Sequence, residues 1–167
     1  ALKLTVQSDY YHEVLDQLDP DKKLVLVTMH RRENQGQPMR NVFAALREMV
    51  DLHQEIEVVY PVHLSPAVQE AANDILAGHD RIHLIEPLDV FDFHNLASRS
   101  YFIMTDSGGV QEEAPSLGKP VLVLRDTTER PEGVRAGTLK LVGTNPARVK
   151  EAMVVLLTDE TLYRKMS

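Results

Sequence analysis

Short apolar runs alternate with amphipathic segments along most of this chain. Six apolar runs predict buried strands at residues 24–29, 57–60, 81–85, 101–104, 121–124 and 138–142. Apolar positions spaced three and four apart predict helices between them, at 37–53, 65–77, 89–97, 109–117 and 144–157, with a last helix capped by Asp159. Strands that alternate with helices are typical of an α/β fold, in which helices cover both faces of a parallel sheet.

The sequence predicts one domain preceded by a connector segment. Residues 1–21 are polar and amphipathic, with a short helix expected from Ser8 to about Leu18, and we assign them as a connector segment. Residues 22–167 are assigned to one Rossmann-like domain, because a chain of 167 residues can bury one substantial core. Sheets of this kind bind ligands at the carboxyl ends of their strands.

The amino-acid composition argues against several classes of binding partner and of metal site. The net charge of −7 argues against nucleic acids and anionic membranes, whose phosphates would be repelled overall. The sequence has no cysteine, which rules out disulfides and thiolate metal sites and suits the reducing cytoplasm. No apolar run approaches the roughly 18 residues that span a membrane, and no signal-peptide pattern opens the chain.

Polar, glycine and charged residues follow five of the predicted strands. These segments are 30–34 (HRREN), 61–63 (PVH), 87–88 (PL), 106–109 (DSGG) and 125–132 (RDTTERPE). In a parallel sheet the carboxyl ends of the strands share one edge, so we expect these segments to line one rim.

The stretch TDSGG at 105–109 joins a strand to a helix. The first amides of a helix have no partner within it, and glycines let an anion approach the backbone closely. Ser107 adds a hydroxyl donor beside Gly108 and Gly109, and Glu113 lies one turn later, where it can accept hydrogen bonds from a ribose diol. The alternative is that the glycine pair simply makes a tight turn before a helix that opens with glutamates.

Several charged and aromatic residues on this rim have two interpretations. His30 and Arg31 are either a solvated loop or part of a site. Arg130 is a candidate cation for a diphosphate, with Arg125 and Arg135 as competitors that the sequence does not rank. Phe93 either packs in the core or contacts the base of a nucleotide.

Four motifs together resemble one known family. HRREN at 30–34, YPVH at 60–63, TDSGGVQEEAPSLGKPV at 105–121 and RDTTERPEGV at 125–134 are similar to those of the non-hydrolysing bacterial UDP-N-acetylglucosamine 2-epimerases. The resemblance covers nearly the whole chain. It implies the second, nucleotide-binding domain of a two-domain enzyme of the glycosyltransferase-B type, with the first domain absent.

The resemblance also implies roles for individual residues. The diphosphate of UDP would be held by Ser107, Gly108 and Gly109, and Arg130 would face its phosphates. Glu113 would bind the ribose hydroxyls, and the uracil would lie against Phe93 and the backbone near Leu88. His30 would lie near the reacting bond, beside the β-phosphate. Arg31 and His63 match positions of an activating second UDP-N-acetylglucosamine site. No NAD and no essential metal is expected.

The implied reaction interconverts UDP-N-acetylglucosamine and UDP-N-acetylmannosamine for cell-wall polysaccharide biosynthesis. UDP is eliminated to give 2-acetamidoglucal and is then added back with the opposite configuration at C2. His30 would stabilise or protonate the departing phosphate. Because the family's acidic residues for proton removal lie in the absent domain, this chain alone is expected to bind UDP weakly and not to epimerise. The full-length enzyme is expected to be a cytoplasmic homodimer.

Two other functions remain open from the sequence. A glycosyltransferase of the same architecture would share the pattern Glu-Ala-x-x-x-Gly-x-Pro-Val, which residues 113–121 reproduce. Retaining members place a glutamate eight residues before Glu113, where this chain has Thr105 next to Asp106, which weakens that interpretation. A nucleotide-sugar binding or regulatory module is the second alternative.

Overall fold

Six parallel strands form a single sheet in the order β3-β2-β1-β4-β5-β6. The computed structural model describes residues 18–19, 21–113, 117–125 and 139–166, so most of the connector assigned to 1–21 lies outside the described residues. The strands are β1 Lys23–Thr28, β2 Ile56–Pro61, β3 Ile82–Ile85, β4 Phe102–Thr105, β5 Val121–Val123 and β6 Leu139–Leu141. Each predicted strand is found with its ends shifted by one residue at most, and the predicted α/β class is confirmed.

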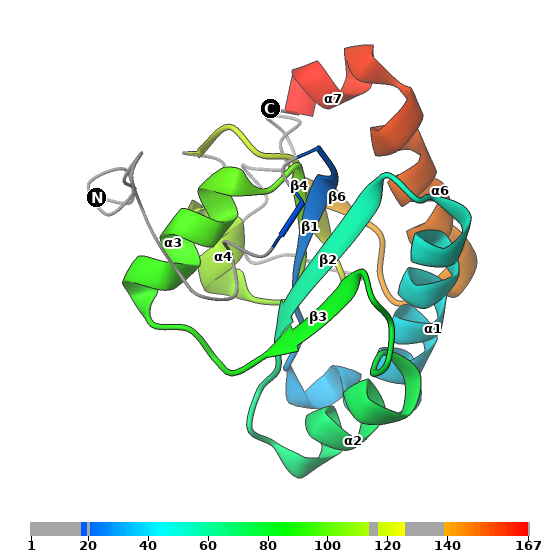
Figure 1. Ribbon diagram of the computed structural model, residues 1–167, viewed down its shortest axis with the longest axis vertical. Helices are drawn as coiled ribbons and strands as arrows, with labels where there is room; N and C mark the ends of the chain where they lie inside the picture. Colours follow the sequence, from blue (N-terminus) through cyan, green and yellow to red (C-terminus); the bar gives the residue numbers. More distant parts are fainter. Residues whose placement is uncertain (1–17, 20, 114–116, 126–138, 167) are drawn as a thin grey trace.

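Helices cover both faces of this sheet, as Figure 1 shows. They are α1 Gln37–Leu52, α2 Pro66–Ile75, α3 Val90–Arg99, α4 Gly108–Glu113, α6 Pro146–Thr158 and α7 Glu160–Met166, with a short 3-10 helix, η3 Arg32–Asn34, before α1. Helices α1, α2 and α6 pack on one face, where their apolar residues form one core with Val25, Val27 and Tyr60. Helices α3 and α4 pack on the other face against Leu26 and Val59.

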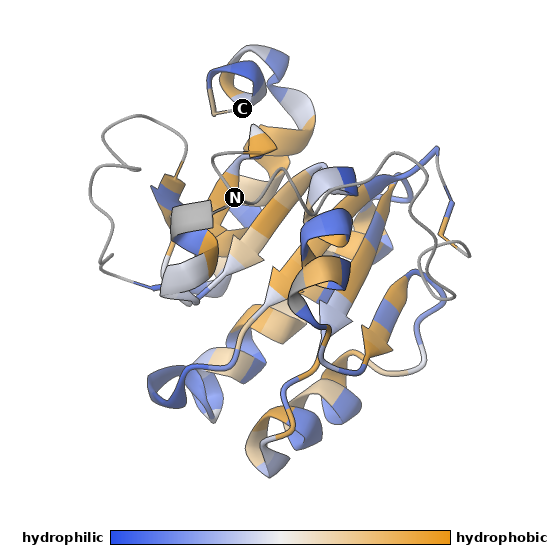
Figure 2. Cartoon of the chain, turned by 90° about the vertical axis from the view of Figure 1, so that its left-hand side faces the viewer, coloured by the Kyte–Doolittle hydropathy of each residue, from blue (hydrophilic) through white to orange (hydrophobic). Residues whose placement is uncertain are grey.

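Alternation along each strand sends its side chains into these two cores. In β1, Leu24 and Leu26 belong to one core while Val25 and Val27 belong to the other. Because both faces are covered, most strand residues are apolar rather than only every second one, with exceptions such as Glu57 in β2 and His83 in β3. Figure 2 shows the strands as the most hydrophobic part of the chain, with polar residues on the outer sides of the helices.

The residues at the helix starts show which of the predicted caps form. The Asp89 carboxylate accepts the amide N–H of Asp92 at 2.7 Å, and Asp159 accepts that of Leu162 at 3.0 Å, so both predicted caps are confirmed. The cap predicted at Ser65 is wrong, because Ser65 makes no side-chain cap and instead donates its amide to the His63 ring. Asn145, which the sequence pattern did not single out, caps α6 by accepting from the amides of Ala147 and Arg148.

The direction of the crossovers reverses between β1 and β4. Helix α1 leads from β1 toward β2 over one face, whereas α4 leads from β4 toward β5 over the other. The loops that follow β1 and β4 therefore diverge, and an open position forms between them at the carboxyl ends of the strands. This switch point is where His30 and Ser107 lie.

Tyr60, at the end of β2, ties this edge of the sheet to the end of β1. Its side chain is fully buried, and its hydroxyl donates to the carbonyl oxygen of Met29, the residue before His30. Burial raises the pKa of the Tyr60 hydroxyl, and the nearby Asp106 carboxylate raises it further. The folded chain thus keeps Tyr60 protonated at pH values where the unfolded chain ionises it.

We expect Tyr60→Phe to lower the free energy of unfolding by about 1 to 3 kcal/mol near neutral pH, because the Met29 carbonyl loses its buried donor. The stability that neutral Tyr60 contributes is full below its ordinary pKa of about 10 and is lost as the pH rises further. The difference between the two proteins should therefore narrow above pH 10. Urea unfolding across neutral and alkaline pH measures this, and parallel pH profiles would contradict it.

Candidate functional site

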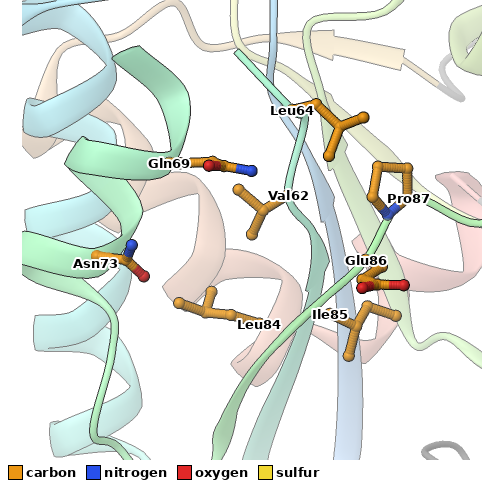
Figure 3. Close-up of a pocket in the computed structure, with 8 residues that line it drawn as sticks. All are labelled: Val62, Leu64, Gln69, Asn73, Leu84, Ile85, Glu86 and Pro87. Carbon is orange, nitrogen blue, oxygen red and sulfur yellow. The ribbon is translucent and has the colours of Figure 1, made fainter. Parts of the chain in front are cut away.

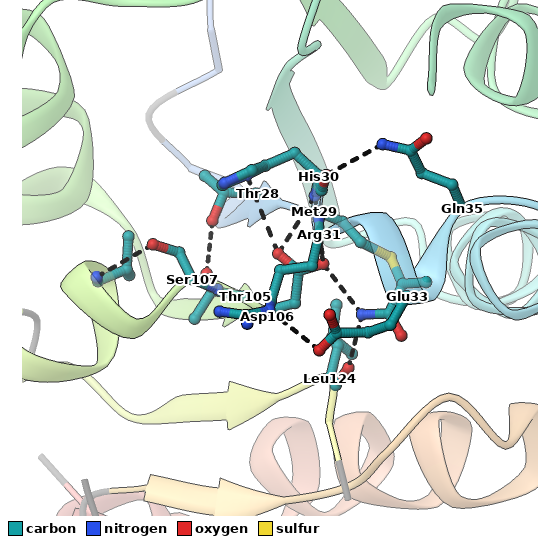
Figure 4. Close-up of polar contacts among 12 residues, drawn as sticks. Thr28, Met29, His30, Arg31, Glu33, Gln35, Thr105, Asp106, Ser107 and Leu124 are labelled. Carbon is teal, nitrogen blue, oxygen red and sulfur yellow. Dashed lines mark hydrogen bonds and ion pairs between the residues drawn. The ribbon is translucent and has the colours of Figure 1, made fainter. Parts of the chain in front are cut away.

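The loops after β1 and β4 start side by side at the switch point before they diverge, and a buried carboxylate joins their first residues. Asp106 follows β4, is fully buried, and receives hydrogen bonds from the loop after β1. Its oxygens accept the amide N–H of His30 at 3.2 Å, that of Arg31 at 2.9 Å, and the side-chain N–H of Asn34 at 3.0 Å (Figure 4). The carboxylate thereby fixes the backbone from which His30 projects.

Further hydrogen bonds extend this connection to the neighbouring strands. The hydroxyls of Thr28 and Thr105 lie 2.6 Å apart, and Thr105 also accepts the amide of Ser107 at 2.9 Å. The Asn34 side chain donates to the carbonyl oxygen of Leu124 at 3.3 Å, which reaches the end of β5. Three strand ends are therefore held in one hydrogen-bonded group, and Figure 4 shows these side chains converging.

Arginine and glutamate side chains form the outer part of this group. Glu33 contacts the Arg31 guanidinium at 3.0 Å and the Arg125 guanidinium at 3.4 Å. Arg125 is only 13% exposed, so this candidate cation is engaged at the base of the loop after β5. The competing candidates Arg130 and Arg135 lie outside the described residues.

His30 projects from the anchored loop with 44% of its side chain exposed. Its Nδ1 lies 3.9 Å from an oxygen of Asp106, which is too far for a hydrogen bond. Its ring stacks on that of His63, with centroids 5.4 Å apart and planes inclined by 13°. The structure thus brings together two histidines that follow different strands.

A hollow of about 260 Å³ opens between α3 and the start of α4. It is lined by Leu88, Asp89, Phe93, His94, Ser107, Gly109 and Val110. Four of the predicted ligand-binding residues, Leu88, Phe93, Ser107 and Gly109, therefore meet in one place, and Gly108 begins the adjoining helix. The side chain of Glu113 lies outside the described part of the structure.

The donors in this hollow suit an anion. Ser107 Oγ accepts the amide of Val110 at 3.5 Å, which leaves its hydroxyl proton for another acceptor. Gly109 presents no side chain, so a ligand atom can come close to the first amides of α4. Phe93 is half-buried and meets the ring of His94 edge-on at 6.4 Å. A flat apolar surface and a group of donors are thus present side by side.

Two larger hollows lie next to this one along the loop after β3. One, of about 350 Å³, is lined by Val62, Leu64, Gln69, Asn73, Leu84, Ile85, Glu86 and Pro87 (Figure 3). The other, of about 620 Å³, continues from Leu84 to Asp92 and shares Leu88 and Asp89 with the hollow at α4. Converging donors, rather than volume, single out the hollow at α4 as the candidate site.

The sequence did not predict the roles of three residues at the site, although two of them, Asp106 and Asn34, lie in segments expected on the rim. Asp106 and Asn34 are joined across 72 positions of sequence, and such a contact leaves no trace in local periodicity. His94 lies next to Phe93 on α3 but is buried and lines the hollow. The one available signal was an aspartate that follows an apolar strand and comes two residues before a glycine pair.

Within the described residues, no group of three or more histidine, aspartate or glutamate side chains is arranged to hold a metal ion. None of the helices described is both long enough and apolar enough to cross a membrane.

The strand order, the switch point and the hollow that opens there define a Rossmann-like α/β domain with its ligand site at the carboxyl edge of the sheet. The chain belongs to the UDP-N-acetylglucosamine 2-epimerase family, whose model matches residues 1–167.

Known relatives are similar in both sequence and structure. The UDP-N-acetylglucosamine 2-epimerase of Bacillus subtilis (strain 168) is 61% identical over 100% of this chain and 44% of its own length. The structure of S. aureus MnaA with UDP has a TM-score of 0.93 and 56% identity, covering 99% of this chain and 45% of that one. The structure of the Neisseria meningitidis enzyme bound to UDP-GlcNAc has a TM-score of 0.89 and 44% identity, covering 92% of this chain and 42% of that one. This chain thus spans less than half the length of these relatives.

We expect Asp106→Asn to destabilise the fold by about 2 kcal/mol or more, because an amide group would then face three donors where a carboxylate accepted them. Asp74→Asn is the matched control, since Asp74 is 54% exposed and pairs with Arg40 at the surface. That change should cost no more than about 1 kcal/mol. Urea unfolding of the three proteins compares them, and equal losses for the two variants would contradict the role given to Asp106.

Proposed function

We propose that this chain is the UDP-binding part of an enzyme that interconverts UDP-N-acetylglucosamine and UDP-N-acetylmannosamine. The observation that carries the proposal is the hollow in which Leu88, Phe93, Ser107 and Gly109 meet. Membership of the 2-epimerase family supports it, as do the UDP and UDP-GlcNAc complexes of similar proteins. Family membership over the whole chain also favours an epimerase over a glycosyltransferase or a regulatory module.

In this proposal the diphosphate binds against Ser107, Gly108 and Gly109. The α4 amides and the Ser107 hydroxyl donate to its oxygens, and the positive end of the helix favours its charge. The uracil lies toward Leu88 and Phe93, where an apolar ring and the backbone of the loop after β3 can receive a base. Glu113 is assigned to the ribose hydroxyls, and Arg130 to the phosphates, on the resemblance of their motifs.

The reaction breaks the bond between C1 of the sugar and the β-phosphate oxygen while a base removes the proton from C2. This gives UDP and 2-acetamidoglucal, and the reverse addition delivers a proton to the opposite face of C2. His30, near the end of the diphosphate, stabilises or protonates the departing phosphate. The base belongs to the part of the full-length protein outside this chain, so this chain alone binds UDP without turnover.

The remaining features of the whole enzyme are proposed on the same basis. The first domain closes the cleft over the sugar, two copies of the enzyme form a dimer, and the enzyme works in the cytoplasm without NAD or an essential metal. Arg31 and His63 contribute to a second UDP-N-acetylglucosamine site beside the first. The hydrogen bond from the Arg31 amide to Asp106 would place that second site against the loop that carries His30.

We expect Gly109→Ala to weaken UDP binding by about tenfold or more, because its methyl group would occupy the position from which a phosphate approaches the α4 amides. The protein itself tolerates this methyl group, since a Cβ built at Gly109 would meet only Ser107 Oγ at an ordinary 3.8 Å. Calorimetric or NMR titration of this chain with UDP measures the change.

Uridine is the matched control ligand, because it keeps the base and ribose but has no phosphate. Its affinity should be the same for both proteins, and the melting temperature of Gly109→Ala should be no lower than that of the parent. Failure of the parent chain to bind UDP, or equal UDP affinities for the two proteins, would refute the placement of the diphosphate.

A further inference from the structure

We propose that His63 is a positioning residue, whose ring holds the ring of His30 at the orientation needed to meet the departing phosphate. The inference rests on the proposed function and adds to it, because the second-site role expected for His63 needs contact with a ligand and not with His30. It starts from the stacked pair that the two rings form, 5.4 Å between centroids and 13° between planes.

The Asp106 carboxylate fixes the backbone of His30 but not its ring. Both oxygens accept the His30 amide at 3.2 Å, and the Gln35 side chain donates to the His30 carbonyl oxygen at 3.3 Å. The distance of 3.9 Å from Nδ1 to Asp106 is beyond hydrogen-bond range. An imidazole that is 44% exposed and held only through its backbone is free to change rotamer, so its orientation requires another contact.

His63 supplies that contact from a strand end that is itself fixed. Its Nδ1 accepts the amide of Ser65 at 3.1 Å, which places the proton of the neutral ring on Nε2 and sets the ring orientation. Val62, the residue before it, donates its amide to the carbonyl oxygen of Ile85 at 2.9 Å. The hydroxyl of Tyr60 binds the Met29 carbonyl, so the ends of β2 and β1 cannot move apart without breaking a buried hydrogen bond.

The stacked arrangement suits a group that must reach a phosphate. Stacking engages the faces of the imidazoles, whereas the ring nitrogens of His30 make their hydrogen bonds in the plane of the ring. His30 can therefore donate to a phosphate oxygen while His63 restricts its rotation. A misplacement of about 1 Å at a reacting group can cost as much as a hundredfold in rate, so this restriction has a kinetic consequence.

The contact between the two rings can be tested by NMR in this chain, and the test does not require enzymatic turnover. With centroids 5.4 Å apart, the ring protons of His30 lie close enough to His63 for its ring current to shift their resonances. We expect His63→Ala to move these proton resonances and His63→Phe to keep a ring-current shift on them, because phenylalanine keeps a ring there. Unchanged His30 resonances in His63→Ala would overturn the inference.

The consequence for catalysis is tested in the full-length enzyme with UDP-N-acetylglucosamine at saturation. We expect His63→Ala to lower kcat by roughly tenfold to a hundredfold with a smaller change in KM, and His63→Phe to recover most of the loss. His53→Ala is the matched control, since His53 precedes β2 at the opposite edge of the sheet and should leave kcat unchanged.

Each result has a distinct meaning. Equal losses in His63→Phe and His63→Ala would show that the imidazole nitrogens of His63 matter rather than its stacked face, and would overturn the positioning role. Full activity in both variants would overturn it as well. An inactive parent enzyme would instead refute the proposed function, while the ring-proton shifts would still decide whether His63 holds His30.

Discussion

The buried carboxylate of Asp106 is the constraint on which the geometry of this site depends. A charge removed from water is costly unless hydrogen bonds replace its hydration. Here the amides of His30 and Arg31 and the side chain of Asn34 provide that replacement. Because the donors come from the loop after β1 and the acceptor from the loop after β4, satisfying the charge also fixes the two loops relative to each other.

The topology of the sheet gives this contact its functional importance. Crossovers leave β1 and β4 over opposite faces, so their loops diverge and leave room for a ligand between them. One loop carries His30 and the other carries Ser107, Gly108 and Gly109. In the proposed reaction the first group meets the departing oxygen and the second holds the diphosphate to which that oxygen belongs. In the proposed reaction the distance between the two groups therefore affects catalysis, and Asp106 fixes the loops on which that distance depends.

The sequence was sufficient to predict the fold and the edge of the sheet where the site lies. Both cores are made of strand residues whose apolar runs are visible directly, and glycine at 108 and 109 marks the start of α4. Ser65 does occupy the N-cap position of α2, but its hydroxyl makes no cap there, and a single sequence does not show whether a capping side chain will make its hydrogen bond.

Contacts between distant residues were beyond what a single sequence shows. Asn34 contacts Asp106 from a short 3-10 helix that the hydrophobic periodicity of the sequence does not predict. The His30–His63 stack joins residues that follow two different strands. His63 was placed on the rim by its position after a strand, but its expected role came from the resemblance of its motif and was a different one. Local patterns specify each element, whereas the pairing of loop residues depends on how neighbouring strands are placed in the sheet.

Amide hydrogen exchange at His30 and Arg31 tests the central claim most directly. Both amides lie in a loop at the surface edge of the sheet, where amides exchange quickly unless they are hydrogen-bonded. If Asp106 holds them as described, they should exchange as slowly as the amides of β1, through cooperative unfolding of the domain. Exchange as fast as that of unbonded loop amides would contradict the account.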